Sequence, residues 1–284
     1  MTTLHLISTN IGSDIFHHLS TFLQVNTTLT KLDIGGGDGI PDVSVASSLS
    51  DAIHNHPTLE ELEFVCCDLL SGNTNILRRI LEGCTKLKTL MITYEDEMSN
   101  EGATAVADFI ERNHPAEGIM LNVNNLSDSH TKILASSLKR NTNLRVFDLK
   151  EDGNYTETGR KILLDVLFDA TSMDSIVTSN HSCILMSQDM NNFWSSLDVL
   201  STRSDLEVEI EKINRLEDAS ISQKIRRKVV LALCGTDGEL FDLRHFNDIP
   251  LQLMPRVLEL IQEHSGPRTK KWVNGAWVHA TLSN

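Results

Sequence analysis

The stretch Ala116-x-x-Ile119-x-Leu121-x-x-Asn124-x-Leu126 decides the fold, because its opening spacing of apolar residues recurs along the chain. Copies of this Leu-x-x-Leu-x-Leu core begin at Leu29, Leu59, Leu87 and Leu144, with weaker copies at Met1 and Met173. The middle positions of these cores are residues 4, 32, 62, 90, 119, 147 and 176, so each step is 28 to 30 residues. Six nearly equal steps indicate a structural repeat.

Between consecutive cores, the chain has a turn residue and then apolar residues at helical spacing, such as Ile133, Leu134 and Leu138. Each unit is therefore predicted to be a strand, a turn and a helix. One such unit cannot bury its own apolar face, so neighbouring units must stack and share a core. Strands joined through a helix pair in parallel, and such crossovers are right-handed. The sequence predicts an α/β solenoid with parallel strands inside and helices outside.

The pattern resembles the leucine-rich repeat family, and specifically its ribonuclease-inhibitor-like branch, over residues 1–183. The family pattern is Leu-x-x-Leu-x-Leu-x-x-Asn/Cys-x-Leu, and Asn124 and Cys67 stand at its Asn/Cys position. A repeat of 28–29 residues with a full helix is typical of this branch. The resemblance implies a right-handed solenoid of about seven repeats that binds another protein. It also implies an alternative, because such repeats build inhibitors of enzymes and activators of small GTPases.

From residue 184 the repeat stops, and a small, mainly α-helical C-terminal domain is expected over residues 184–284. Apolar residues at helical spacing predict helices near residues 190–200, 206–216, 220–235 and 255–264. Asn274-Gly275 between short apolar strands predicts a hairpin in the tail. The domain is interpreted as a cap for the open end of the solenoid, or alternatively as a separate partner-binding or oligomerising module. The basic run Lys224–Lys228 is interpreted as the solvated face of a helix.

Composition and charge exclude several classes of partner. The chain has 284 residues and a net charge of −14, and residues 1–183 hold 13 Lys and Arg against 25 Asp and Glu. Such an acidic region repels phosphate backbones, so no nucleic-acid partner is expected. No run of 18 apolar residues is present, so no membrane-spanning helix is expected either. Five cysteines are a sparse, odd set, and with no signal peptide they favour the cytoplasm or the nucleus.

No motif in the sequence predicts catalysis. The segment Gly35–Gly39 lacks the Lys-Ser/Thr of a phosphate-binding loop, and Asp38 would repel phosphate. Cys67 is interpreted as a buried structural thiol, and His54 and His56 as turn residues without further metal ligands at zinc spacing. We expect no enzymatic activity, no cofactor and no metal.

Strand alternation assigns a set of side chains to the concave face of the predicted solenoid. Acidic residues gather near its N-terminal end, and two methionines follow, a residue type common on adaptable binding surfaces. The predicted partner-binding residues are Asp33, Glu61, Glu63, Met91, Met120 and Asp148. The expected function is a non-catalytic scaffold that binds a basic or basic-apolar protein, and the alternative interpretation of these residues is a merely solvated sheet face.

Overall fold

A computed structural model describes most of the predicted repeat region and parts of the C-terminal region. The described residues are 2–7, 13–36, 42–70, 72–95, 97–112, 115–151, 156–187, 210, 213–216, 218–234, 255, 269–273 and 276–280. The chain divides into two units, one with residues 1–166 and 182–199 and the other with residues 167–181 and 200–284.

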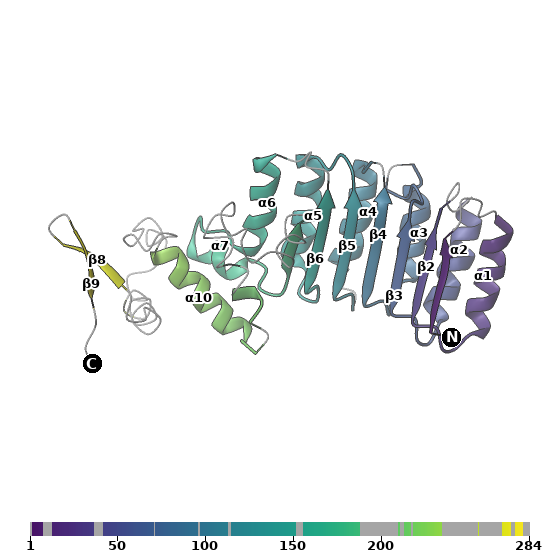
Figure 1. The fold of residues 1–284 in the computed structure, drawn as a ribbon, viewed down its shortest axis with the longest axis horizontal. Coiled ribbons are helices and arrows are strands. Elements are labelled where there is room, and N and C mark those ends of the chain that lie inside the picture. Colours follow the sequence, from purple (N-terminus) through teal and green to yellow (C-terminus); the bar gives the residue numbers. More distant parts are fainter. Residues whose placement is uncertain are drawn as a thin grey trace. The chain divides into compact units, whose positions relative to one another are not determined.

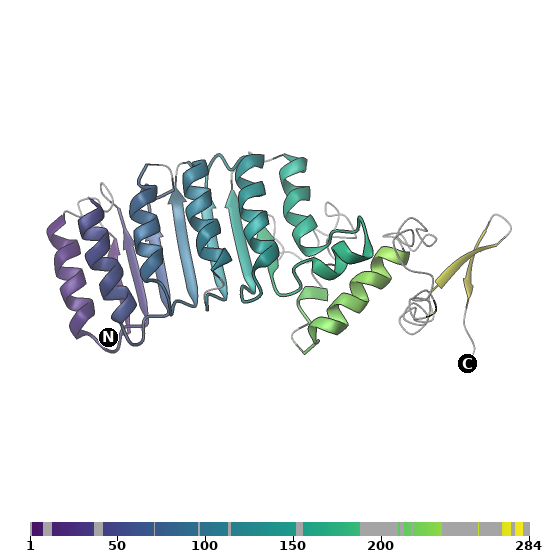
Figure 2. The ribbon, with the colours of Figure 1, turned by 180° about the vertical axis from the view of Figure 1, so that it is seen from behind.

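The first unit alternates strands and helices. Its elements are β1 (Thr3–Ile7), α1 (Ser13–Val25), β2 (Lys31–Gly35), α2 (Val43–Asn55), β3 (Glu61–Val65), α3 (Thr74–Gly83), β4 (Thr89–Glu95), α4 (Asn100–Glu111), β5 (Gly118–Val123), α5 (Asp128–Arg140), β6 (Val146–Glu151), α6 (Glu157–Leu167) and β7 (Ile184–Ser187). The strands form one open sheet in the order β1 to β7, and all of its pairings are parallel. Helices α1 to α6 lie along one face of this sheet (Figures 1 and 2). This architecture confirms an α/β fold with a parallel sheet and is consistent with a repeat solenoid.

The register of the sheet follows the repeat. Leu32, Leu62 and Leu90 are paired across β2, β3 and β4, and each is 0% exposed. Their side chains face the helices, so the residues that alternate with them lie on the opposite face of the sheet, which none of helices α1 to α6 covers and which is called the helix-free face below. In β3 and β5 buried and half-buried residues alternate strictly, as the sequence predicts.

Local sequence explains where the helices begin and how closely they pack. The Asp42 carboxylate accepts hydrogen bonds from two backbone N–H groups at the start of α2, and the Ser99 and Ser127 hydroxyls cap α4 and α5. Gly83 and Gly102 permit close approach between neighbouring repeats. A Cβ at Gly83 would lie 2.2 Å from the carbonyl oxygen of Ser50, and one at Gly102 would lie 2.1 Å from that of Leu70.

The seventh strand differs from the prediction. Residues 173–178, which carry the Met173-x-x-Ile176 spacing, form helix α7 (Met173–Thr178), and the strand that pairs with β6 is β7. Phe147 is paired with Leu185, so the last step is longer than the others. The Ser172 hydroxyl accepts from the Ser175 N–H and caps α7, which explains why this segment is helical.

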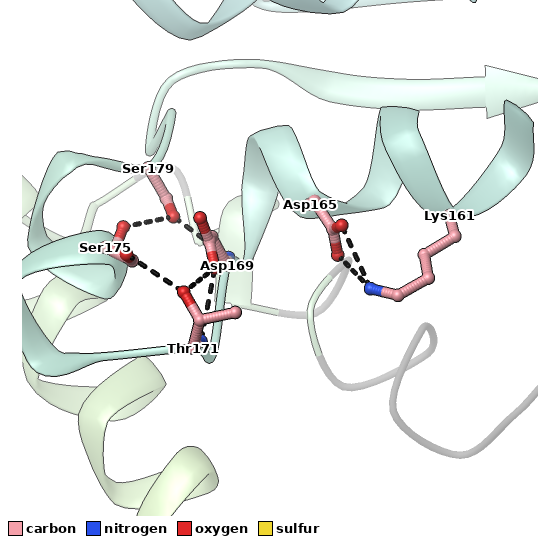
Figure 3. Close-up of polar contacts among 6 residues, drawn as sticks. All are labelled: Lys161, Asp165, Asp169, Thr171, Ser175 and Ser179. Carbon is pink, nitrogen blue, oxygen red and sulfur yellow. Dashed lines mark hydrogen bonds and ion pairs between the residues drawn. The ribbon is translucent and has the colours of Figure 1, made fainter. Parts of the chain in front are cut away.

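Polar side chains around α7 hold its flanking turns, as Figure 3 shows. Thr171 donates its hydroxyl to the Asp169 carboxylate at 2.6 Å, and the Asp169 N–H donates to the Ser179 hydroxyl at 3.1 Å. The Ser179 hydroxyl in turn donates to the backbone carbonyl of Ser175 at 2.8 Å. The same figure shows, on α6, the i to i+4 ion pair of Lys161 and Asp165 at 2.8 Å.

The second unit also contains α10 (Ile221–Cys234) and an antiparallel hairpin of β8 (Thr269–Val273) and β9 (Ala276–Ala280). These elements confirm the predicted helix over 220–235 and the predicted tail hairpin. Ser220 begins α10 with a reciprocal cap, because its hydroxyl accepts from the Gln223 N–H and its own N–H donates to the Gln223 side chain. The helices predicted over 190–200 and 255–264 lie outside the described residues, apart from Pro255, and of 206–216 only 210 and 213–216 are described.

The basic run on α10 differs from the interpretation as a solvated face. Lys228 is 0% exposed, and its ammonium nitrogen donates to the carbonyl oxygens of Leu167 at 2.5 Å and Asn180 at 3.1 Å. Lys224 donates to the carbonyls of His181 and Asn214. Both lysines therefore join α10 to other segments of the second unit, and only Arg227 of the run is exposed.

Candidate protein-binding surface

The six predicted residues lie in two adjacent columns on the helix-free face. One column pairs Asp33 with Glu63, Glu63 with Met91, Met91 with Met120, and Met120 with Asp148. Glu61 lies in the next column, between Lys31 and Thr89. Strand pairing thus brings together side chains that are about 30 residues apart in sequence. Because neighbouring strands lie ~4.8 Å apart, consecutive members of a column are in reach of one another.

The N-terminal end of the surface is an ion-pair network. Asp33 contacts His5 through one carboxylate oxygen and Lys31 through the other, and the Lys31 ammonium lies 3.5 Å from the Glu63 carboxylate. Burial opposes the charge of Lys31, but the attraction of Asp33 and Glu63 outweighs it and raises the pKa of Lys31. The Thr93 hydroxyl donates to Glu63 at 3.4 Å. The single Lys31 ammonium therefore offsets part of the negative charge of Asp33 and Glu63.

Two of the predicted acidic residues are not exposed. Asp33 is 3% exposed and Asp148 is 6% exposed, whereas Glu61 and Glu63 are half-buried. Asp33 is covered because the side chains of His5 and Lys31 close over it from the neighbouring strand and from its own strand. Of the predicted acidic residues, Glu61 and Glu63 are therefore the two available to a partner.

The middle of the surface is apolar. Met91 and Met120 are register partners, and both are half-buried. Gly118 lies beside them in the neighbouring column, where an added Cβ would meet only Thr89, at 3.8 Å or more. The glycine therefore leaves room next to the methionine pair for a side chain from another molecule. Methionine adapts its shape to such a side chain because it is unbranched.

A ladder of alternating charge precedes the strands. Glu60 contacts Lys88 at 2.8 Å, and Glu117 contacts Arg145 at 3.9 Å. A hydrogen bond from Lys88 to Glu60 raises the pKa of the lysine. These residues occupy the position just before β3, β4, β5 and β6, so one border of the surface carries both signs of charge.

A second ladder, which was not among the features predicted from the sequence, lies where each helix returns to the next strand. The Asn26 amide oxygen accepts from the N–H groups of Thr28 and Leu29, and Asn141 accepts from Asn143 and Leu144 in the same way. His56 and Cys84 stand at the same place in their repeats. The signal was available, since each of these residues precedes the first Leu of a core by three positions. The role is structural, because these side chains satisfy backbone groups.

Two thiols of the repeats, Cys67 and Cys84, are buried. Cys67 is buried and directs its sulfur to the carbonyls of Ile34 and Val65, as expected for the turn position. Burial raises the pKa of Cys84 to about 12, which keeps this thiol protonated and unreactive. Among the described residues, no group of three or more His, Cys, Asp or Glu side chains could hold a metal ion. No helix in the described part of the chain is long and apolar enough to cross a membrane.

Compared with known protein-family models and with curated protein sequences, the chain matches none of them.

Proposed function

We propose that the chain is a leucine-rich repeat protein of the ribonuclease-inhibitor-like type and acts as a non-catalytic, protein-binding scaffold. The support for the repeat type is the spacing of 28 to 30 residues between the first six cores, together with the strand and the helix that each of these repeats forms. The single observation that carries the proposed function is the Met91–Met120 pair on the helix-free face of the sheet.

The chemistry of this face favours a partner with an apolar side chain next to a basic one. The methionine pair and the space at Gly118 suit an apolar group that is desolvated on binding. Glu63 lies beside Met91 in the same column, and Glu61 lies one column away. Half-buried carboxylates at the border of an apolar patch favour a cation there and speed its approach. Asp33 contributes little, since it is buried and the Lys31 ammonium already lies 3.5 Å from its carboxylate.

Regulation of an enzyme is the alternative function that the proposed repeat type suggests. An inhibitor or a small-GTPase activator would use the same face, with the enzyme as its partner. The protein would be intracellular, in the cytoplasm or the nucleus. Affinity purification of binding proteins with the wild-type chain and with a Met91→Ala/Met120→Ala variant identifies the partner as the protein lost in the variant. A GTPase or a nuclease among the lost proteins supports the regulatory form.

Binding kinetics test the surface once the partner is known. Met91→Ala with Met120→Ala should raise the dissociation rate, because the desolvated contact is lost. Glu61→Lys should lower the association rate, most strongly at low salt. Glu111→Lys on α4 makes the same charge change on the helical side and is the matched control. If Met91→Ala/Met120→Ala and Glu61→Lys bind like the wild type, or if Glu111→Lys slows association as much as Glu61→Lys does, the helix-free face is not the binding site.

A further inference from the structure

The N-terminal end of the sheet exposes apolar residues whose counterparts in β2 to β6 are buried. Leu4 and Leu6 are half-buried, whereas their register partners Leu32 and Ile34 are 0% and 1% exposed. β1 pairs with β2 on one side, and it is the edge strand of the sheet (Figure 1). Within the part of the chain that the structure describes, the interior shared by the repeats is therefore open at this end.

Helix α1 extends the same apolar surface. Ile15, Phe22 and Val25 recur at helical spacing along one side of the helix, next to its buried face. Ile15 is 39% exposed, Val25 is 75% exposed and Phe22 is half-buried. Isolated apolar residues on a surface are common, but here they lie on the helix that follows the edge strand β1 in the same repeat.

This end is also nearly free of charge. Asp14 is the single Asp, Glu, Lys or Arg among residues 1–30, in a chain with 23% of these residues and a net charge of −14. Two copies of the chain repel each other over most of their surfaces. They repel each other least where the N-terminal ends meet.

We propose that this end is a self-association surface, at which two copies of the chain join through β1 and α1 around a twofold axis. The contact would resemble the one between neighbouring repeats of the chain, where strands pair, apolar side chains pack between the sheet and the helices, and helices lie side by side. A second copy supplies a strand edge, an apolar interior and a helix at once. The same end of a second copy is equally poor in charged residues, so the two surfaces do not repel each other when they meet.

The backbone of β1 sets the register of this pairing. The Thr2 carbonyl accepts from the N–H of Lys31, so β1 directs the polar groups of even-numbered residues to β2 and those of Thr3, His5 and Ile7 outward. An antiparallel pairing centred on His5 places Thr3 opposite Ile7 of the second copy, so the outward groups bond to each other. The same register places Leu4 opposite Leu6 of the second copy, so the apolar faces are continuous.

Measurement of the molar mass of the full chain by light scattering and sedimentation tests the proposal. The wild type should have twice the mass of a 31.7-kDa chain. Val25→Glu places a charge on an exposed position of the surface, and Thr3→Pro removes an outward N–H without touching the bonds to β2. Each variant should weaken the dimer roughly tenfold or more. Circular dichroism should show that both remain folded.

Val43→Glu is the matched control, because Val43 is a 50% exposed valine on α2, outside the proposed surface. It should leave the dimer unchanged. Added salt should tighten the wild-type dimer, since it screens the repulsion between two acidic copies. A monomeric wild type at high micromolar concentration overturns the proposal. So does a dimer that Val25→Glu and Thr3→Pro leave intact, or one that salt dissociates.

Discussion

The repeats and the second unit, in which α10 contacts residues 167–181, satisfy their buried polar groups in different ways. In the repeats, the interior is apolar, backbone groups are paired by the sheet and helices, and cations stay on the surface in pairs such as Arg140 with Glu111. In the second unit, Lys228 is fully buried and donates to two backbone carbonyls. Leu167 is the last residue of α6, and Asn180 follows α7 closely, so these carbonyls belong to helix ends.

The difference shows what a repeat provides. Each repeat presents the same strand edge to the next repeat, so the backbone groups of neighbouring repeats pair in the same way along the sheet. Where the repetition ends, carbonyls at helix C-termini have no such partner. A lysine can reach them and is favoured there by the helix dipole. Its burial, however, opposes the charged form and, with the nearby charge of Lys224, lowers the pKa of Lys228 to about 7.

The largest expected effect tests the apolar half of this comparison. Leu62 is 0% exposed on the core side of β3, while Glu61 beside it is half-buried on the helix-free face. Leu62→Ala leaves a cavity and should reduce the free energy of unfolding by ~2–5 kcal/mol. Glu61→Ala should change it by about 0.5 kcal/mol or less. Urea unfolding followed by circular dichroism measures both, and equal losses would show that the register of β3 is wrong.

The second effect tests the buried lysine. Between about pH 7 and 10.5 the unfolded chain protonates Lys228 and the folded chain does not. The free energy of unfolding should therefore rise with pH over this range, by up to about 1.4 kcal/mol per unit. A neutral amine still donates two hydrogens, which suffices for the carbonyls of Leu167 and Asn180.

Urea melts between pH 7 and 9.5 measure this slope, and Lys228→Met should flatten it. Arg227→Met is the control on the same helix, since Arg227 is exposed. NMR of the lysine side chains gives the pKa of Lys228 directly. A value near 10.5 would contradict the comparison, because the buried lysine would then behave like one on the surface.

The same contrast explains what could be predicted from the sequence. The Leu32–Leu62–Leu90 ladder follows from a short repeat, so strands, helices and the faces of side chains were predictable. The placement of strand seven was wrong because the Met173-x-x-Ile176 spacing also fits one side of a helix, and the Ser172 cap selects the helix. Strand alternation assigned Asp33 to the correct face, but it carries no information on how His5 and Lys31 cover it.

Lys228 was missed for a related reason. A basic run at helical spacing predicts a solvated face when nothing specifies what packs against the helix. Here the packing partners are carbonyls of Leu167 and Asn180, which are distant in sequence and belong to no repeat. Such contacts are set by tertiary structure alone.

A smaller effect tests the ladder of turn residues. Asn141 accepts from two backbone N–H groups and donates its amide to the carbonyl of Ile110 at 2.6 Å. His56 accepts at 3.3 Å from Thr58 N–H, and its buried Nε2 has no hydrogen bond. His56→Asn should therefore stabilise the protein by about 1 kcal/mol at neutral pH.

The pH dependence sharpens this third prediction. Burial, with a smaller effect of Lys86, lowers the pKa of His56. As pH falls below 6.5, the unfolded chain takes up a proton at His56 that the folded chain resists, so stability falls. The gain from His56→Asn should grow between pH 6.5 and 5 in thermal or urea melts. His54→Asn, at an exposed position two residues away, is the control substitution for these melts.

The smallest expected effect tests the claim that surface cations matter little in the repeats. The Arg140 guanidinium on α5 lies 2.7 Å from the Glu111 carboxylate on α4, and the two side chains are 60% and 46% exposed. Water screens a pair of this kind, and ordering two long side chains costs entropy. A double-mutant cycle with Arg140→Ala and Glu111→Ala should give a coupling of only ~0.2–1 kcal/mol. The coupling should shrink further in 0.5 M salt, because the Debye length then falls well below its low-salt value. A coupling well above this range that persists in salt would show that the helices of the repeats, too, depend on fixed charges, and the contrast with Lys228 would then lie in burial alone.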